Sequence, residues 1–230
     1  MNALILCGGY GKRLGSITKK TPKPLVTIKK KPFIEYIISD LVDLKIPKIF
    51  LLCSYKSHFF FKNYRNKKID ETKIICIKES RPLGTGGAIL NIKEKLEDLF
   101  LLLNGDSYFK INLKKFINDG IKNSCDAKIA LTLNKFYKLN SQLSQLILDE
   151  KNFVLKKEKG KLMNAGIYLI KKKSLNLMKN KKCSLERDFL EELILKKKIE
   201  GEYFKKNFID IGTVENLKKA KNKYNLYFRD

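Results

Sequence analysis

Apolar residues gather in short runs along the chain, and most of these runs are nearly continuous rather than alternating with polar residues. Runs of this kind are typical of strands that are covered on both faces of a sheet. They predict strands at residues 3–7, 49–53, 73–77, 99–103, 128–133 and 165–170.

Between these runs, apolar residues recur at the spacing of one helix face. A helix is predicted to begin at Pro32, whose fixed φ suits a first helical position, and Thr213 is predicted to cap a last helix. Strands that alternate with helices predict an α/β protein with a doubly wound, mostly parallel sheet. We expect one domain that spans residues 1–230.

The first predicted strand leads into a polar loop that is rich in glycine, with Gly8, Gly9 and Gly11 followed by Lys12 and Arg13. Exposed backbone N–H groups beside cations suit an anion such as a polyphosphate. The spacing matches neither the dinucleotide fingerprint nor the Walker loop, so an ordinary turn with solvated lysines is the alternative. Ligands of doubly wound sheets bind beyond the carboxyl ends of the strands, which favours phosphate binding here.

A second glycine-rich segment, PLGTGGAI, follows the third predicted strand. Glu79 ends that strand, and the glycines from Gly84 onward open a helix. A loop that merely tolerates glycine is the alternative. Two glycine-rich loops at the same edge of a sheet favour a ligand site.

Two aspartates are predicted at the same edge, since Asp106 follows the fourth strand and Asp210 precedes the last helix. Lone aspartates in loops are often turn or capping residues. Beside a polyphosphate loop they are better interpreted as ligands of Mg²⁺, which takes one or two carboxylates together with phosphate oxygens.

The chain has 230 residues and a formal net charge of +25, which by itself suggests a nucleic-acid ligand. Its 49 cationic residues are spread along nearly every segment, and most are lysines. Specific base recognition depends on arginine, so we expect no specific nucleic acid and interpret the lysines as a solvated surface. A lysine-rich protein that binds polyanions through its surface is the alternative of another class.

No apolar run is long enough to span a bilayer, and the first strand begins without a charged leader, so we expect a cytoplasmic protein without membrane insertion. The five cysteines show no paired spacing, which argues against disulfides and zinc. His58, the single histidine, is expected on a helix surface or in a satisfied interior position.

The motifs LCGGYGKRL, PKP, PLGTGGAI, NGD, NAGIY and DIGT, in this order, make the chain similar to the sugar-1-phosphate nucleotidylyltransferases. The ordered set is far more specific than any one motif. Within that family, KPFIEY, the carboxylate of Glu79 and SLERDFLEEL most resemble the D-glycero-D-manno-heptose 1-phosphate guanylyltransferases.

The resemblance implies a three-layer, Rossmann-like fold of the nucleotide-diphospho-sugar transferase type. It implies GTP or another NTP and a sugar 1-phosphate as substrates, Mg²⁺ as cofactor, and a product used for capsule or other surface glycans. The sequence leaves the oligomeric state open, with a homodimer among the options.

The resemblance also assigns residues to the substrates and the metal. The catalytic group is Arg13, Lys23 and Asp106, and the metal ligands are Asp106 and Asp210. The nucleotide-binding residues are Leu6, Gly8, Gly9, Gly11, Lys12, Arg13, Glu79, Leu83, Gly84 and Asp106. The sugar-binding residues are Asn104, Glu158, Lys159, Asn164, Gly166 and Glu186.

Some of these assignments have a structural alternative or depart from the family pattern. Glu158 and Lys159 match a Glu-Lys pair, but Lys156 stands where an aromatic residue is usual, and the pair could shift by one residue. Glu186 would favour a helix dipole whatever the function, and Asn164 could simply bond the backbone at a strand start.

Glu79 is assigned to the base on chemical grounds. Guanine presents N1–H and its exocyclic amine as adjacent donors, and a carboxylate accepts from both, whereas pyrimidines do not match that pair. The alternative is an ion pair of Glu79 with Arg81 or with a nearby lysine.

The implied reaction needs no protein nucleophile. The sugar phosphate oxygen is largely ionised near neutral pH and can attack the α-phosphorus of the nucleotide directly. Positioning and charge neutralisation remain for the protein, and Arg13, Lys23 and the metal would supply them. Mannose or glucose 1-phosphate, with another base, are the alternatives within the enzyme class.

Overall fold

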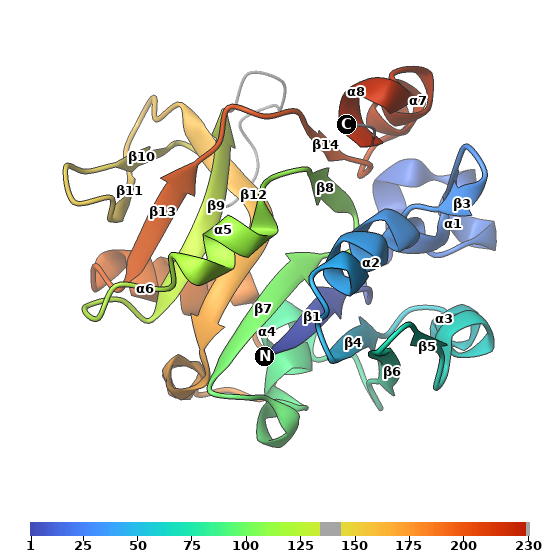
Figure 1. Ribbon diagram of the computed structural model, residues 1–230, viewed down its shortest axis with the longest axis horizontal. Coiled ribbons are helices and arrows are strands. Elements are labelled where there is room, and N and C mark those ends of the chain that lie inside the picture. The colour runs from blue at the N-terminus through green and yellow to red at the C-terminus, as the bar shows by residue number, and fades with distance from the viewer. Residues whose placement is uncertain (134–143, 229–230) are drawn as a thin grey trace. The chain divides into compact units, whose positions relative to one another are not determined.

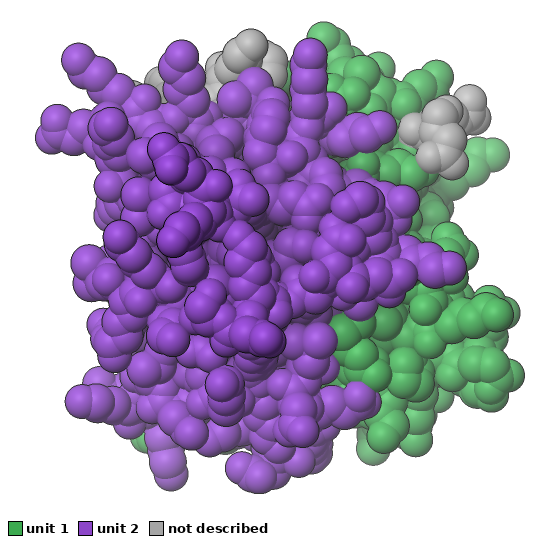
Figure 2. All heavy atoms as spheres, turned by 60° about the vertical axis from the view of Figure 1, so that its left-hand side comes forward, with its two compact units in different colours: residues 1–81, 103–110, 207–230 green, residues 82–102, 111–206 purple. Residues whose placement is uncertain are grey.

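The computed structural model describes residues 1–133 and 144–228, and strands and helices are interspersed along the chain (Figure 1). The chain forms two compact units (Figure 2). Unit 1 consists of residues 1–81, 103–110 and 207–230, and unit 2 consists of residues 82–102 and 111–206. Neither unit is one continuous stretch of chain. The expectation of a single domain over residues 1–230 stays a prediction.

Unit 1 contains a sheet whose three long strands are parallel. These strands are β1 (Asn2–Leu6), β4 (Lys48–Cys53) and β6 (Thr72–Lys78), with the short antiparallel strand β5 (Lys68–Ile69) beside β6. Nearly all residues of β1 and β4 are buried, as expected for strands covered on both faces. The carboxyl ends of the three strands therefore point toward one edge of this sheet.

The helices of unit 1 follow or precede these strands. Their bounds are η1 (Lys12–Leu14), α1 (Ser16–Lys20), η2 (Lys23–Leu25), α2 (Ile34–Asp43), α3 (Ser57–Tyr64), α7 (Val214–Asn222) and α8 (Tyr224–Phe228). The predicted cap is confirmed, because Thr213 Oγ1 accepts a hydrogen bond from the backbone N–H of Asn216 at 3.1 Å. The last helix is nevertheless divided, since the backbone of Lys223 leaves the helical region between α7 and α8.

The prediction that Pro32 begins a helix is wrong. Pro32 lies in β3 (Lys31–Pro32), which pairs with β2 (Thr27–Ile28), and the helix begins two residues later. The fixed φ of proline suits an edge strand as well as a first helical turn, and neither position needs its missing N–H.

Another two-stranded sheet of unit 1 joins segments that are far apart in the sequence. β8 (Ser107–Phe109) pairs antiparallel with β14 (Phe208–Asp210). The rings of Phe109 and Phe208 pack edge to face, with centroids 5.7 Å apart. This pairing determines where the residues at the ends of both strands lie.

Unit 2 is built around β9 (Ala127–Leu133), which pairs antiparallel with β12 (Leu162–Lys171) and parallel with β13 (Ile199–Tyr203). β10 (Leu146–Leu148) pairs with β11 (Val154–Lys156) and with the start of β12. The helices of this unit are α4 (Gly84–Leu90), η3 (Lys93–Lys95), α5 (Leu113–Asn118), η4 (Lys172–Leu177), η5 (Glu186–Leu190) and α6 (Glu191–Leu195).

β7 (Leu99–Asn104) passes from unit 2 into unit 1. Each of the predicted strands is confirmed within a few residues. His58 is exposed on α3, as expected for a helix-surface histidine. The five cysteines are free thiols. None of the helices in the described part of the chain has the length and apolar character needed to cross a membrane.

Candidate functional site

The loop after β1, residues Gly8 to Arg13, is called the phosphate loop below. The last hydrogen bond between the β1 segment and β4 is donated by the backbone N–H of Cys7 to Leu52 O at 2.9 Å. Within residues 1–133 and 144–228, no protein acceptor takes the backbone N–H groups from Gly8 to Gly11. Since unpaired N–H groups attract anions, this backbone has the character expected of a phosphate site.

The surroundings of the glycines differ between two positions of the phosphate loop. Gly11 has a positive φ of 63°, and a Cβ there would lie 2.7 Å from Thr18 Cγ2. A Cβ at Gly9 would meet no atom within 4 Å. Gly11 therefore shapes the loop, whereas Gly9 leaves open space beside the backbone, as a ligand would require.

Lys23 and Asp106 form an ion pair beside this loop. Lys23 Nζ lies 2.5 Å from Asp106 Oδ2, and the two side chains are 9% and 30% exposed. Lys23 begins the turn η2, and its neighbours Pro22 and Pro24 are buried, so the backbone that carries it is well fixed. The predicted catalytic cation and the predicted metal ligand are thus brought together.

Asp210 reaches the same place through the β8–β14 pairing. Asp210 lies opposite Ser107 in this pairing, and the backbone N–H of Ile211 donates to Asp106 O at 2.9 Å. Burial, together with the neighbouring Asp106 carboxylate, raises the pKa of Asp210 to about 6, although Lys23 and Arg13 act in the opposite direction. The two carboxylates are therefore close enough to repel each other.

Arg13 extends from the phosphate loop to these aspartates. A Cβ at Gly212 would lie 2.9 Å from an Nη atom of Arg13 and 2.5 Å from Asp210 Oδ1. The backbone N–H of Gly212 also donates to Asp210 Oδ1. Glycine at position 212 thus leaves room for the guanidinium beside the carboxylate of Asp210. Arg13 therefore lies close to the acidic pair of Asp106 and Asp210.

The residues present fit a divalent cation. Two repelling carboxylates offer the oxygen ligands that Mg²⁺ prefers, and a cation between them would relieve their repulsion. No group of three or more His, Cys, Asp or Glu suited to a metal occurs among the residues described. A metal on Asp106 and Asp210 would therefore take its other ligands from phosphate and water.

The remaining nucleotide residues of unit 1 lie at strand ends. Leu6 ends β1 and is partly exposed, and Lys12 is exposed on η1. Glu79 directly follows β6, is partly exposed, and donates its backbone N–H to Cys53 O at 3.1 Å. The position of Glu79 leaves its side chain at the carboxyl edge of the sheet, and its role with the base stays a prediction.

The second glycine-rich loop, Leu83 to Gly87, belongs to unit 2 and is organised differently. The backbone N–H groups of Gly86 and Gly87 donate to Cys183 O at 3.0 and 3.3 Å, and Leu83 O accepts from Cys183 N at 3.0 Å. A Cβ at Gly86 would lie 2.8 Å from Cys183 Sγ. These glycines let the chain pack against its own segment around residue 183, a reason that the sequence interpretation did not include.

Glu186 is held by this second loop. Glu186 Oε2 accepts hydrogen bonds from Thr85 Oγ1 at 3.0 Å and from Ser184 Oγ at 2.9 Å, while Thr85 Oγ1 accepts from the backbone N–H of Leu185 at 2.8 Å. Thr85 was missed from the sequence, although a hydroxyl between glycines was a visible signal. The carboxylate is oriented by two hydroxyls, so it is positioned rather than freely rotating.

Asn164 lies at an irregularity of β12. Its Oδ1 accepts from the backbone N–H of Gly166 at 2.8 Å, and its Nδ2 donates to Tyr168 Oη at 2.6 Å. Gly166 has a positive φ of 75°, and the pairing with β9 shifts register between Asn164 and Tyr168. A bulge of this kind re-aims side chains, which suits a binding residue.

The other predicted sugar residues are less constrained. Glu158 and Lys159 are exposed in a turn after β11, and Lys159 has a positive φ of 63°. Asn104 ends β7 and belongs to unit 1 rather than unit 2. The site assignments of these three residues stay predictions.

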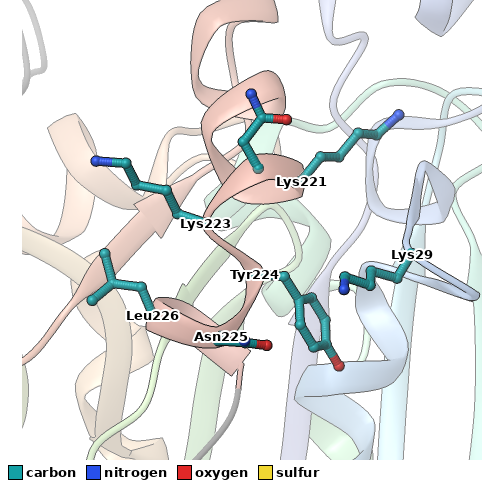
Figure 3. A pocket seen from close by; sticks show the side chains of 7 residues that line it. Lys29, Lys221, Lys223, Tyr224, Asn225 and Leu226 are labelled. Carbon is teal, nitrogen blue, oxygen red and sulfur yellow. The ribbon is translucent and has the colours of Figure 1, made fainter.

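Unit 1 also has a hollow of about 320 Å³ between the β2–β3 turn and the α7–α8 junction. Figure 3 shows that the ammonium groups of Lys221 and Lys223 point in different directions. Lys29 Nζ lies 4.9 Å from the centre of the Tyr224 ring. The lysine charges of this hollow do not converge on one point, in contrast to the charges of Lys23 and Arg13 near Asp210.

Comparison with known proteins agrees with this geometry. Residues 2–226 match the family model described as nucleotidyl transferase. D-glycero-alpha-D-manno-heptose 1-phosphate guanylyltransferase of Aneurinibacillus thermoaerophilus is 33% identical, with 99% of this chain and 100% of that protein covered. The enzyme of the same name from Campylobacter jejuni subsp. jejuni serotype O:2 is 36% identical, with 94% and 96% covered.

The crystal structure of HddC from Yersinia pseudotuberculosis, complexed with GMP-PN, is similar with a TM-score of 0.78 and 31% identity. The structural match covers 97% of this chain and 99% of the HddC chain. The predicted α/β fold class is therefore confirmed. The match over nearly the whole chain means that this protein belongs to the nucleotidyl transferase family.

Proposed function

We propose that the protein transfers a nucleoside monophosphate from an NTP to a sugar 1-phosphate and releases pyrophosphate. The observation that carries this proposal is the meeting of Arg13, Lys23, Asp106 and Asp210 beside a glycine loop whose backbone N–H groups find no acceptor among the residues that the structure describes. Two cations, two carboxylates and exposed amides are what a polyphosphate and its metal require.

The reaction is a displacement at the α-phosphorus. A sugar phosphate oxygen forms a bond to the α-phosphorus, the bond from the α-phosphorus to the bridging oxygen breaks, and that electron pair leaves with pyrophosphate. The phosphate loop holds the leaving group by its N–H groups, and Arg13 neutralises charge that develops on it. Lys23, fixed by Asp106, is placed to neutralise the phosphate at the reacting centre.

We include Mg²⁺ as the metal, with Asp106 and Asp210 as its protein ligands. When bound, Mg²⁺ would neutralise phosphate charge and orient the two reacting groups. Because Lys23 contacts only one oxygen of Asp106, the other oxygen is available for such a role, apart from a contact with Ser107 Oγ at 3.3 Å.

We further propose that the base is guanine and the sugar is D-glycero-D-manno-heptose 1-phosphate. The names of the two curated relatives support both choices, and the GMP-PN complex of the similar structure supports the base. Glu79 would accept the two adjacent donors of guanine. The sugar would contact Asn164 and Glu186, whose side chains are oriented by hydrogen bonds.

The proposal places the protein in the cytoplasm, because both substrates are highly charged phosphates, and it assigns the NDP-sugar product to capsule or other surface glycans. A homodimer is the oligomeric state to be tested first, and light scattering on the purified protein would decide between monomer and dimer.

A substrate panel tests the reaction directly. Four nucleoside triphosphates would be combined with heptose, mannose and glucose 1-phosphates in the presence of Mg²⁺, and pyrophosphate release would be measured. We expect the highest kcat/KM with GTP and the heptose phosphate. A preference for mannose or glucose 1-phosphate would overturn the sugar assignment, and no release with any pair would overturn the proposed reaction.

The Glu79→Gln variant tests the base assignment within the same panel. Losing one acceptor should lower GTP use and relax discrimination against UTP and dTTP, since unpaired polar groups are what reject a wrong partner. An unchanged ranking of the four bases in this variant would show that Glu79 does not read the base. Arg81→Ala is the matched control, because a rim ion pair would make both variants behave alike.

A further inference from the structure

The segment that follows β4, residues 54–56, touches the phosphate loop and the helix α1 behind it. A Cβ at Gly8 would lie 3.0 Å from Ser54 Cβ, so the loop backbone approaches Ser54 closely. The rings of Tyr10 and Tyr55 lie with their centroids 5.2 Å apart. Neither of these two contacts involves Arg13, Lys23 or Asp106, the residues assigned to catalysis above.

Lys56 connects this segment to α1 by hydrogen bonds. Its Nζ donates hydrogen bonds to Thr18 O at 3.2 Å and to Lys19 O. These carbonyls belong to the last turn of α1, where helix carbonyls lack partners within the helix. The backbone of Lys56 has a positive φ of 53°, a conformation that is uncommon for a residue with a side chain.

Thr18 continues this connection into the phosphate loop. Thr18 is buried, and its Oγ1 donates to Gly11 O at 3.0 Å with a second contact to Gly15 O at 3.2 Å. Its Cγ2 fills the space beside the Cα of Gly11. Lys56, Thr18 and Gly11 are therefore linked by an unbroken series of contacts.

We propose that Lys56 is a positioning residue for the nucleotide phosphates, acting through Thr18 on the phosphate loop. By fixing the carboxyl end of α1, Lys56 holds Gly11 in its left-handed conformation and keeps the N–H groups of the loop directed away from the protein. This inference rests on the proposed function, because it assigns the loop to the phosphates of the NTP.

The hydrogen bonds of Lys56 distinguish positioning from direct binding. Two of its three N–H donors are engaged by α1, so its charge is already placed against carbonyl oxygens. A cation that contacted phosphate directly would act independently of Thr18. A positioning residue loses its effect once the Thr18 hydroxyl is removed, and this difference can be measured.

The test is a double-mutant cycle with Lys56→Met and Thr18→Val, both of which keep the size of the side chain. Binding of inorganic pyrophosphate and of GTP would be measured by calorimetry, and KM would be measured separately for GTP and for the sugar phosphate. Lys62→Met is the control, because Lys62 is exposed on α3, the helix that begins directly after Lys56. Circular dichroism would establish that each variant is folded.

We expect Lys56→Met to weaken pyrophosphate and GTP binding about tenfold, equivalent to about 1.4 kcal/mol, with KM for the sugar phosphate unchanged. Thr18→Val should have a similar effect, and the double variant should lose little more than either alone. Lys56→Arg keeps the donors and should bind within about twofold of the wild type, since a change that small lies below 0.5 kcal/mol.

Several results would overturn the proposal. Losses that add in the double variant would indicate a direct phosphate contact, and a Lys56→Met effect equal to that of Lys62→Met would indicate no role. If Lys56→Met does not fold, a tenfold loss in the folded Lys56→Arg variant would contradict it instead. Because pyrophosphate binding needs no turnover, the absence of turnover in the wild type would count against the proposed function alone.

Discussion

The two glycine-rich loops look alike in sequence but differ in what surrounds them. In the phosphate loop, the backbone N–H groups from Gly8 to Gly11 have no protein acceptor among the described residues, and Gly9 borders open space. In the second loop, Gly86 and Gly87 donate to Cys183 O, and their missing side chains leave room for residues 178–183. The backbone N–H groups of Gly86 and Gly87 are thus occupied by the chain itself, whereas the described residues offer no acceptor to the N–H groups from Gly8 to Gly11.

This difference separates two uses of glycine. A glycine can let a ligand approach the backbone, or it can let another part of the same chain do so. In the second loop, Gly86 and Gly87 let another segment of the same chain pack closely. This loop contributes to the proposed sugar site through Thr85, whose hydroxyl donates to the carboxylate of Glu186. We therefore expect a change at Gly9 to affect activity and a change at Gly86 or Gly87 to affect stability.

The largest effect is expected where the phosphate loop meets its acidic pair. Asp106→Asn and Asp210→Asn should each reduce turnover by about 10²-fold or more, because each removes a charge from the proposed metal site. Pyrophosphate release at saturating Mg²⁺ would be the measurement, with circular dichroism as the control for folding. If both variants kept near-normal Mg²⁺-dependent release, the metal assignment would be wrong.

Arg13→Ala is expected to have the next largest effect. Removing the guanidinium that lies beside Asp210 should lower kcat/KM for the NTP by roughly tenfold to 10²-fold, in the range of a lost charge-assisted contact. Lys67→Ala removes an outlying cation and should change kcat/KM by less than about twofold, as an exposed charge does. Equal and small effects in both variants would return the phosphate loop to the status of a surface turn.

A matched pair of glycine variants tests the comparison itself. Gly87→Ala should lower the free energy of unfolding by about 1–3 kcal/mol, because its Cβ would collide with the backbone at Lys181. Gly9→Ala should change it by less than about 0.5 kcal/mol and instead raise KM for the NTP. Urea unfolding and steady-state kinetics on both variants would measure this, and the reverse pattern would break the comparison.

The smallest effect is expected for Asp40, which contributes to the stability of unit 1 and lies outside the phosphate loop. Burial raises the pKa of Asp40 on α2 to about 6. The folded state then holds a proton that the unfolded state has lost, so the free energy of unfolding should fall as the pH rises from about 4 through 6. Asp40→Asn should flatten this pH dependence in urea unfolding while leaving KM for the NTP unchanged. An equally steep dependence in the variant would show that other groups cause it.

Secondary structure was predicted correctly where it depends on residues that are close together in the sequence. Continuous apolar runs located the strands, and the hydroxyl of Thr213 located a helix start, because both depend on neighbours within a few residues. The error at Pro32 has the same origin, since a fixed φ suits two local structures. The candidate site was predicted largely through the order of its motifs.

The sequence by itself determined the strand pattern, the two glycine-rich loops, the placement of Asp106 after a strand and, through resemblance, the family. Only the tertiary structure decided that Lys23 pairs with Asp106 across 83 residues, that β14 brings Asp210 to the same place, and that Lys56 supports α1. It also decided that the second set of glycines serves the chain's own packing. The reason is physical: periodicity and capping are encoded by adjacent residues, whereas contacts between distant segments depend on how whole strands pair and pack.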